Sequence, residues 1–315
     1  MSLRTVKAVP FLLQQQSRYF LQNTFGNFQH AQMSSNTTYT STPTTSTAKK
    51  NKELQQFNDS TQKEIDHHAR LSATWWDLNG PLHGLHKLND LRVPFVSHGL
   101  GAQSTVNKNF RNTIDMNSIS TASLLKGKNI LEVGCGGGIL TEALARLNAN
   151  VTGVDLGADV IMTAETHLKE HSPELVERIT YKTESIAQHA DEYANHYDAV
   201  VCSEVLEHID EKEAFLKDCV RAIKPGGSIF ITTLNKTVLQ WFIGIILGEY
   251  IFGVAPKNTH HWSKLIAPQD VQRILAALNC ETVSLNGLTY NVFYRRWRWI
   301  NTKKLCYALH AVKAA

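Results

Sequence analysis

Short apolar runs alternate with amphipathic stretches from residue 129 onward, and this alternation predicts a parallel sheet covered by helices. The predicted strands are apolar runs, which lie near 129–133, 150–155, 179–182, 197–203, 228–233, 281–285 and 306–313. The predicted helices have apolar residues at helical spacing, and they lie near 138–147, 158–170, 213–223 and 268–278. Lys224-Pro-Gly-Gly227 predicts a reverse turn before the fifth strand. We therefore expect an α/β domain without internal repeats.

A helical pattern precedes the predicted sheet. Residues 53–76 and 80–96 place leucines and aromatic residues among charged ones, whereas 96–116 is polar and contains glycine. We expect a helical preface over 53–96, followed by a loop, within a single domain that spans 49–315. With 315 residues and 43% hydrophobic content, the chain is long enough for one large domain with extensions.

The first fifty-two residues differ in composition from the rest. Met1–Lys52 contains no Asp or Glu, and residues 3–20 can form a basic amphipathic helix followed by Ser, Thr and Gln. This composition predicts a mitochondrial transit peptide with a disordered polar linker over 1–48. A disordered polar tail that lacks acids by chance is the alternative.

Charge and cysteine content exclude two classes of function. The net charge is +4, and much of the positive excess lies in the first fifty residues, so the body carries no evident nucleic-acid patch. The five cysteines are scattered without CxxC pairs, which favours a reducing compartment and argues against a thiolate zinc site. We expect no nucleic-acid partner.

The segment Ile130-Leu-Glu-Val-Gly-Cys-Gly-Gly-Gly-Ile139 predicts a strand, a glycine loop and a helix that bind a nucleotide. Asp155 ends the next predicted strand, where its carboxylate can accept hydrogen bonds from ribose hydroxyls. A dinucleotide fingerprint would require glycine at Ile139, and the loop has no basic residue for phosphate. The pattern therefore favours S-adenosylmethionine. A glycine-rich turn that only packs a helix on a strand is the alternative.

The fourth predicted strand ends at Ser203, beside the glycine loop, and acidic residues follow it. Glu204, Glu207 and His208 are spaced by three and four, so a helical turn would place them on one face, where they could hold a divalent ion. The alternative is a helix amino terminus that collects acids, with His208 as a cap or core residue. Spacing alone favours this alternative.

A metal ion would have a defined role in methyl transfer to a phenol, whose pKa is about 10. Chelation of two adjacent oxygens by Mg²⁺ would lower that pKa and orient one oxygen toward the methyl group.

The segment 238–254 is apolar but interrupted by glycines, so it is a poor membrane span and predicts an apolar lid or membrane-facing insertion over 235–265. A buried helix pair is the alternative.

Four blocks resemble the ubiquinone-biosynthesis O-methyltransferases, in particular the mitochondrial eukaryotic branch of this family. They are Trp75-Trp-Asp77 with Leu85-His-Lys-Leu-Asn-Asp-Leu-Arg92, Leu131-Glu-Val-Gly-Cys-Gly-Gly-Gly-Ile-Leu140, Cys202-Ser-Glu-Val-Leu-Glu-His208, and Pro256-Lys-Asn-Thr-His260. The resemblance implies a class I methyltransferase fold, with a seven-stranded, mostly parallel sheet that ends in an antiparallel hairpin. It also implies methylation of polyprenylated catechols, namely a dihydroxybenzoate and a demethylubiquinol, at the matrix face of the inner membrane within a multiprotein complex.

The resemblance also implies roles for individual residues. Arg92 matches the position that binds the methionine carboxylate, and Ser203 matches the position after the fourth strand. The remaining cofactor positions are in the loop and the second strand: Gly134, Gly136 and Asp155. The metal ligands implied by the resemblance are Glu204, Glu207 and His208, so the resemblance favours the metal site that spacing alone did not. His208 or His260 is the expected general base if no metal acts.

The basic aromatic run Tyr294–Ile300 falls outside the resemblance, and we expect either a membrane-surface patch or a solvated hairpin there.

Two alternative functions stay open. One is an O-methyltransferase for a soluble phenolic compound, which the apolar segment 238–254 argues against. The other is a scaffold that binds S-adenosylmethionine without turnover, which the set of Glu204, Glu207 and His208 disfavours.

Overall fold

The computed structural model describes residues 73–80, 82–104, 125–237, 265–291 and 294–315. Its helices are α2 (His83–Ser104), α4 (Ile139–Ala145), α5 (Ala158–His171), α6 (Ile186–Glu192), α7 (Lys212–Ala222) and α9 (Pro268–Ala277), with short 3-10 turns η3 (Pro173–Arg178) and η4 (Leu206–His208). Its strands are β1 (Asn129–Val133), β2 (Asn150–Asp155), β3 (Ile179–Thr183), β4 (Tyr197–Ser203), β5 (Ile223–Leu234), β6 (Cys280–Asn291), β7 (Arg296–Ile300) and β8 (Cys306–Lys313). The predicted transit peptide and most of the predicted apolar insertion lie outside the described residues.

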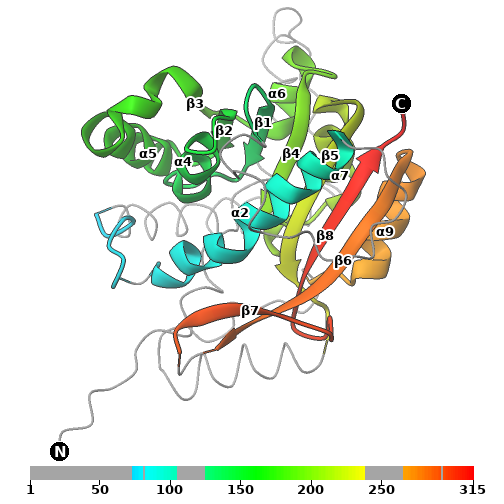
Figure 1. The fold of residues 1–315 in the computed structure, drawn as a ribbon. Coiled ribbons are helices and arrows are strands. Elements are labelled where there is room, and N and C mark those ends of the chain that lie inside the picture. Colours follow the sequence, from blue (N-terminus) through cyan, green and yellow to red (C-terminus); the bar gives the residue numbers. More distant parts are fainter. Residues whose placement is uncertain (1–72, 81, 105–124, 238–264, 292–293) are drawn as a thin grey trace, which may run out of the picture.

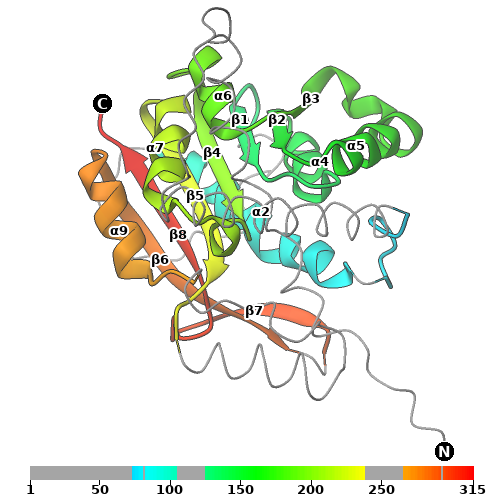
Figure 2. The ribbon, with the colours of Figure 1, turned by 180° about the vertical axis from the view of Figure 1, so that it is seen from behind.

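The strands form one sheet in the order β3-β2-β1-β4-β5-β8-β6-β7 (Figures 1 and 2). The first five pair in parallel, whereas β8 runs antiparallel between β5 and β6. This confirms the expected mostly parallel sheet with an antiparallel end. The order reverses between β1 and β4, which is the position where open α/β sheets bind ligands.

Helices cover both faces of the sheet, so the central strands are buried on both sides. Leu131, Val200 and Ile231 belong to the larger core, which packs on α6, α7 and α9. Their neighbours Ile130 and Val201 belong to a second core with α2, α4 and α5. Alternate residues of one strand therefore enter different cores, which explains why these strands are continuous apolar runs.

Helix α2 extends further than the sequence predicted. It continues through Pro94 to Ser104, although the preface was expected to end near residue 96. Leu88, Val96 and Leu100 are buried at spacings of multiples of four, so one apolar stripe continues to this point. Gly99 allows the close approach, because a Cβ there would lie 2.4 Å from the Phe230 ring. Helix α2 therefore continues into the segment predicted to be a polar loop, because it packs against the sheet there.

The second half of the sheet corrects three predictions. Tyr197 pairs with Ile223 and Ala199 pairs with Ser228, so the expected reverse turn at 224–227 is a bulge within β5. Strand β6 continues past the expected residue 285 to Asn291. It does so because β7 pairs with it as an additional, eighth strand.

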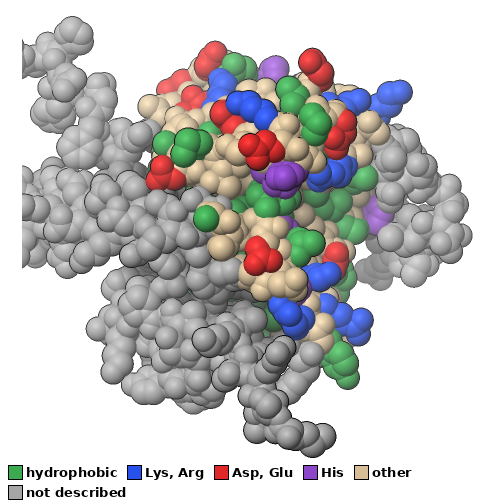
Figure 3. Space-filling view, turned by 90° about the vertical axis from the view of Figure 1, so that its left-hand side faces the viewer, with side chains coloured by type: hydrophobic (Ala, Val, Ile, Leu, Met, Phe, Trp, Pro, Cys, Tyr) green, Lys and Arg blue, Asp and Glu red, His purple; other side chains and the backbone are tan. Residues whose placement is uncertain are grey.

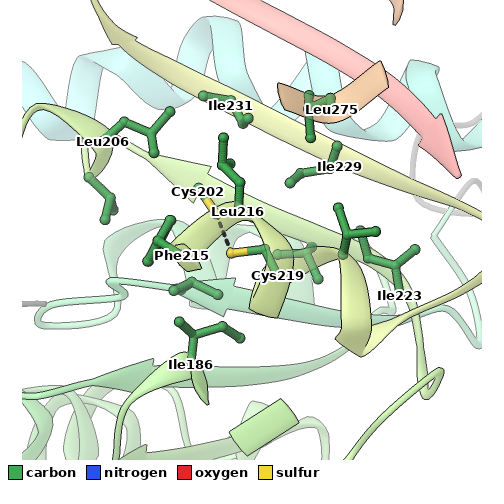
Figure 4. Packing of buried hydrophobic residues seen from close by; sticks show 14 of the residues in the cluster. Ile186, Cys202, Leu206, Phe215, Leu216, Cys219, Ile223, Ile229, Ile231 and Leu275 are labelled. Atoms are coloured by element: carbon green, nitrogen blue, oxygen red, sulfur yellow. Dashed lines mark hydrogen bonds between the residues drawn. The ribbon is translucent and has the colours of Figure 1, made fainter. Parts of the chain in front are cut away.

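The larger core shows how α7 packs on the sheet (Figure 4). Leu216 lies among residues of β4 and β5 such as Ile229, and Cys219 Sγ lies 3.7 Å from Cys202 Sγ. All five cysteines are buried and free. In contrast to the apolar core, the described surface carries charged side chains over its whole visible face (Figure 3). Among the described residues, no helix combines the length and apolarity that a membrane span requires.

His310 on β8 predicts a pH dependence of stability. Its ring stacks on Phe230 at 4.3 Å and bonds Ser228 at 2.8 Å through Nε2, and burial lowers its pKa from 6.5 to about 4. Between these values the unfolded chain binds a proton that the folded protein does not, so stability falls as pH falls. The expected loss is about 3 kcal/mol.

Urea unfolding of His310→Gln between about pH 7 and pH 4 measures this effect, because glutamine does not titrate there. The variant is expected to show a flatter dependence than wild type. The exposed His171→Gln is the control and should follow wild type. If the stability of wild type and of His310→Gln fell equally with pH, His310 would not be the cause of the pH dependence.

Candidate functional site

The glycine loop follows β1 and is closed by backbone hydrogen bonds. Gly134 and Gly136 have φ of 77° and 52°, which side chains rarely adopt. Gly134 N donates to Val154 O at 2.8 Å, and Gly136 N donates to Asp155 Oδ2 at 3.0 Å. The structure therefore brings together three residues predicted to bind the cofactor: Gly134, Gly136 and Asp155.

Asp155 links this loop to the start of α5. Its Oδ1 accepts a hydrogen bond from Gly157 N at 2.8 Å, and the residue is buried. Each carboxylate oxygen has a second lone pair, so a carboxylate fixed by two amides can still accept from a ribose hydroxyl. The ribose role of Asp155 remains a prediction that this geometry permits.

Two tryptophans before α2 cover the glycine loop, a contact that sequence reasoning missed. A Cβ on Gly136 would lie 2.6 Å from the Trp75 ring, and one on Gly137 would lie 2.4 Å from it. Trp76 Nε1 donates to Gly137 O at 3.0 Å. The indole of Trp75 therefore explains part of the glycine requirement. The Trp-Trp pair was visible in the sequence, but no local pattern connects it to a loop about sixty residues later.

Arg92 joins α2 to the carboxyl end of β4. Its guanidinium donates from Nε to Asn89 Oδ1 at 2.6 Å, from Nη1 to Ser203 Oγ at 2.9 Å, and from Nη2 to Leu85 O at 3.3 Å. Ser203 Oγ in turn lies 2.8 Å from Thr232 Oγ1 on β5. Two further residues from the predicted cofactor set, Arg92 and Ser203, are thus in direct contact.

A buried carboxylate beside Arg92 was not assigned from the sequence. Glu132 on β1 accepts a hydrogen bond from Thr141 Oγ1, and burial raises the pKa of Glu132 to about 7. Arg92 is also fully buried, and burial lowers the pKa of its guanidinium to about 10, opposed by the charges of Glu132 and Glu204. The apolar run of β1 could have identified Glu132, because it is the one acid among the apolar residues Ile130, Leu131 and Val133.

Glu204 and Glu207 form a pair of buried carboxyl groups after β4. Thr233 Oγ1 donates to Glu207 Oε2 at 2.7 Å, whereas Glu204 Oε1 has no hydrogen-bond partner among the residues that the structure describes. Burial raises the pKa of both, and the neighbouring Glu204 raises that of Glu207 further. Two adjacent buried carboxylates repel each other, so they require either a shared proton or a bound cation.

The predicted helical face with three metal ligands does not form. Glu204 has a φ of 58°, outside the helical region, and Leu206–His208 is a single 3-10 turn. The described part of the chain contains no group of three or more His, Cys, Asp or Glu side chains placed to hold a metal ion. The structure thus brings together Glu204 and Glu207 but does not add His208 as a third ligand. His260 lies outside the described residues.

The charges of this site are mainly negative. Glu132, Asp155, Glu204 and Glu207 are all buried near the carboxyl ends of β1, β2 and β4. Arg92 lies among them, and its charge acts on Glu132 and Glu204. A site of this composition favours ligands that bring positive charge or hydrogen-bond donors, such as a sulfonium cofactor, its ammonium group, hydroxyl groups or a divalent cation.

Three comparisons relate this chain to known proteins. A methyltransferase domain family matches residues 131–229. The mitochondrial ubiquinone biosynthesis O-methyltransferase of Mus musculus is 43% identical over 254 residues, which are 80% of this chain and 65% of that protein. The ubiquinone biosynthesis O-methyltransferase of Proteus mirabilis is 33% identical over 249 residues, which are 79% of this chain and 91% of that protein. The chain thus spans slightly less than two thirds of the Mus musculus protein.

Among solved structures, a magnesium protoporphyrin IX methyltransferase from Synechocystis with bound S-adenosylhomocysteine is similar to this chain. It is 21% identical, the match covers 73% of this chain and 84% of that chain, and the TM-score is 0.49.

Proposed function

Since this chain belongs to the ubiquinone biosynthesis O-methyltransferase family, we propose that it transfers the methyl group of S-adenosylmethionine to a catechol oxygen of a polyprenylated aromatic compound. The expected class I methyltransferase fold is confirmed by the matching domain and by the strand order. The substrates proposed are a polyprenylated dihydroxybenzoate and a demethylubiquinol.

One observation carries this proposal. The glycine loop with Asp155 and the carboxylate pair Glu204 and Glu207 follow β1, β2 and β4, which are adjacent parallel strands. Arg92 connects the two halves, because its charge acts on Glu132 in β1, which leads into the glycine loop, and also on Glu204 after β4. A donor held at the glycine loop would therefore lie next to an acceptor held near the carboxylates.

The carboxylate pair fits Mg²⁺. Among the described residues, Glu204 Oε1 is buried without a hydrogen-bond partner, and burial raises the pKa of both carboxyl groups although Arg92 and Thr233 partly compensate their charge. Proteins usually hold Mg²⁺ by one or two carboxylates, with water and substrate oxygens completing the octahedron. Glu204 and Glu207 would hold the ion, so a third ligand from His208 is not required. When bound, Mg²⁺ would lower the pKa of a chelating catechol hydroxyl.

The protein's own contribution is orientation and the exclusion of water. Methyl transfer needs the acceptor oxygen and the sulfur in line with the methyl carbon, so placement of the two substrates determines the rate. The loop and Asp155 fix the donor, while Arg92 holds Ser203 and the start of the Glu204 segment in place. If the metal does not act, His208 or His260 would take the proton from the acceptor.

The test is methyl transfer from labelled S-adenosylmethionine to a short-chain prenylated dihydroxybenzoate, with and without chelator. Transfer that chelator removes and Mg²⁺ restores is expected. Chelator-resistant transfer would instead favour a histidine base. Transfer only to an unprenylated phenol would favour the soluble-substrate alternative, and tight cofactor binding without transfer would favour the scaffold.

We also propose that the protein acts in mitochondria, at the matrix face of the inner membrane and within a multiprotein complex of the same pathway. The described residues support membrane contact through β7 and the two residues before it. Tyr294 and Trp299 are 72% and 41% exposed, and Arg296 and Arg298 are exposed beside them, whereas Trp297 is buried and donates to Gly84 O. In Figure 3, Lys and Arg side chains gather at the lower end of the face, with apolar groups beside them.

Charge reversal of this surface is expected to weaken binding to vesicles that contain cardiolipin. Each Arg near an anionic surface contributes about 1 kcal/mol, so Arg296→Glu with Arg298→Glu should weaken binding by roughly thirtyfold or more. Vesicle sedimentation measures the effect. Lys169→Glu with Arg273→Glu reverses two exposed charges elsewhere and is the matched control. Equal binding by both double variants would exclude β7 as the contact surface.

A further inference from the structure

The glycine loop has little stiffness of its own. Gly134, Gly136 and Gly138 all have positive φ, with values of 77°, 52° and 86°. Glycine lacks the Cβ that restricts other residues, so such a loop samples many conformations unless neighbouring groups hold it. A loop that must present backbone amides to a ligand therefore needs external contacts to keep those amides oriented.

Trp76 provides one of these contacts through a single hydrogen bond. Its Nε1 donates to Gly137 O at 3.0 Å, and the carbonyl of Gly137 shares a planar peptide unit with the amide of Gly138. Gly138 N donates to Cys135 O at 3.0 Å, which closes the turn. Rotation of this peptide would break both hydrogen bonds at once. The indole N–H therefore fixes the orientation of the turn from Cys135 to Gly138.

The indole is itself held from α4 and α5. The ring of Trp76 stacks on His167 with centroids 3.4 Å apart and planes 4° from parallel. His167 Nδ1 lies 2.6 Å from Glu142 Oε1. Glu142 is fully buried and also accepts hydrogen bonds from Ser172 and Arg146. His167 is thus fixed at its ring nitrogen and supports the face of the indole.

We propose that Trp76 is a positioning residue for the methyl donor, with His167 as its support, an inference that rests on the cofactor part of the proposed function. Trp76 acts on the donor through Gly137 and the turn it closes, and the acceptor pair Glu204 and Glu207 follows a different strand. Its removal is therefore expected to weaken donor binding and to leave the chemical step and the acceptor site nearly unchanged.

Trp76→Phe tests the hydrogen bond, because phenylalanine keeps a stacking ring and loses the N–H donor. One hydrogen bond contributes a factor of about three to ten in an equilibrium constant. Calorimetry should show S-adenosylhomocysteine binding weaker by about that factor, and KM for S-adenosylmethionine should rise similarly. The acceptor KM and kcat should change by less than about twofold, as they do when only binding is affected.

His167→Leu should weaken the same binding constant, and adding it to Trp76→Phe should have little further effect, because both act through one bond. Lys169→Gln, which changes an exposed side chain of the same helix, is the control and should bind S-adenosylhomocysteine as wild type does. Unchanged affinity in Trp76→Phe would overturn the proposal, and so would parallel changes in acceptor KM and thermal midpoint, which indicate a general structural role.

The two proposals fail in different ways. If wild type binds S-adenosylhomocysteine but methylates no catechol, the proposed function falls, and the variants still decide the role of Trp76 by binding alone. If wild type does not bind S-adenosylhomocysteine, the cofactor assignment and the role of Trp76 are both overturned.

Discussion

Replacing Glu207 with glutamine is expected to lower methyl transfer by about 100-fold or more at a fixed Mg²⁺ concentration. The change removes one of two charges proposed to hold the ion, and a metal ion contributes several kcal/mol to such a reaction. Thr233 can still donate to the amide oxygen of glutamine, so the hydrogen bond at this position is retained. Initial rates across a Mg²⁺ titration measure the loss.

Stability distinguishes this outcome from misfolding. The pKa of Glu207 is raised because burial and Glu204 oppose its charge, so a neutral side chain should leave the free energy of unfolding equal or higher. Activity is therefore expected to fall without a loss of stability. Glu213→Gln, on the exposed side of α7, is the control. Full, chelator-sensitive activity in Glu207→Gln would rule out the carboxylate pair as the metal site.

Replacing Arg92 with methionine is expected to cost about 3 to 5 kcal/mol of folding free energy, the usual effect of leaving buried charges without their partner. The variant loses three donated hydrogen bonds and the positive charge beside Glu132 and Glu204. Arg92→Lys should lie between wild type and methionine, because it keeps the charge but cannot reproduce the directions of a guanidinium. Urea unfolding measures both variants.

The pH dependence of the methionine variant provides a second test. Without Arg92, the pKa of Glu132 should rise above its value of about 7, while in the unfolded chain it stays near 4.5. The folded variant then binds a proton that the unfolded chain does not, so its stability should recover as pH falls from about 8 to 6. A deficit below about 1 kcal/mol, or one independent of pH, would show that Arg92 does not compensate these carboxylates.

The central strands could be predicted from the sequence because burial on both faces makes each one a continuous apolar run. Strands β1, β2, β4 and β8 begin and end where the apolar runs predict. The same reasoning located the ends of these strands, and hence Asp155 and Ser203. Local composition and known strand-order rules were sufficient for this part of the site.

The remaining features depend on contacts between distant segments, which local patterns do not encode. Strand β7 forms because Trp297 packs against Gly84 at the start of α2, more than two hundred residues earlier. Spacing would place Glu204 on one face with Glu207 and His208 if a helical turn began there, whereas its left-handed backbone places it outside any helix. The contact of Trp76 with the glycine loop is equally remote in sequence.

The antiparallel position of β8 has a consequence for the order of folding. Residues 306–313 pair with β5 on one side and with β6 on the other, so they join two strands that do not pair with each other. During synthesis from the amino terminus, β6 and β7 emerge from the ribosome before the strand that connects them to β5. Until residues 306–313 are available, the edge of β6 that pairs with β8 is unpaired, and an unpaired edge can pair with another chain.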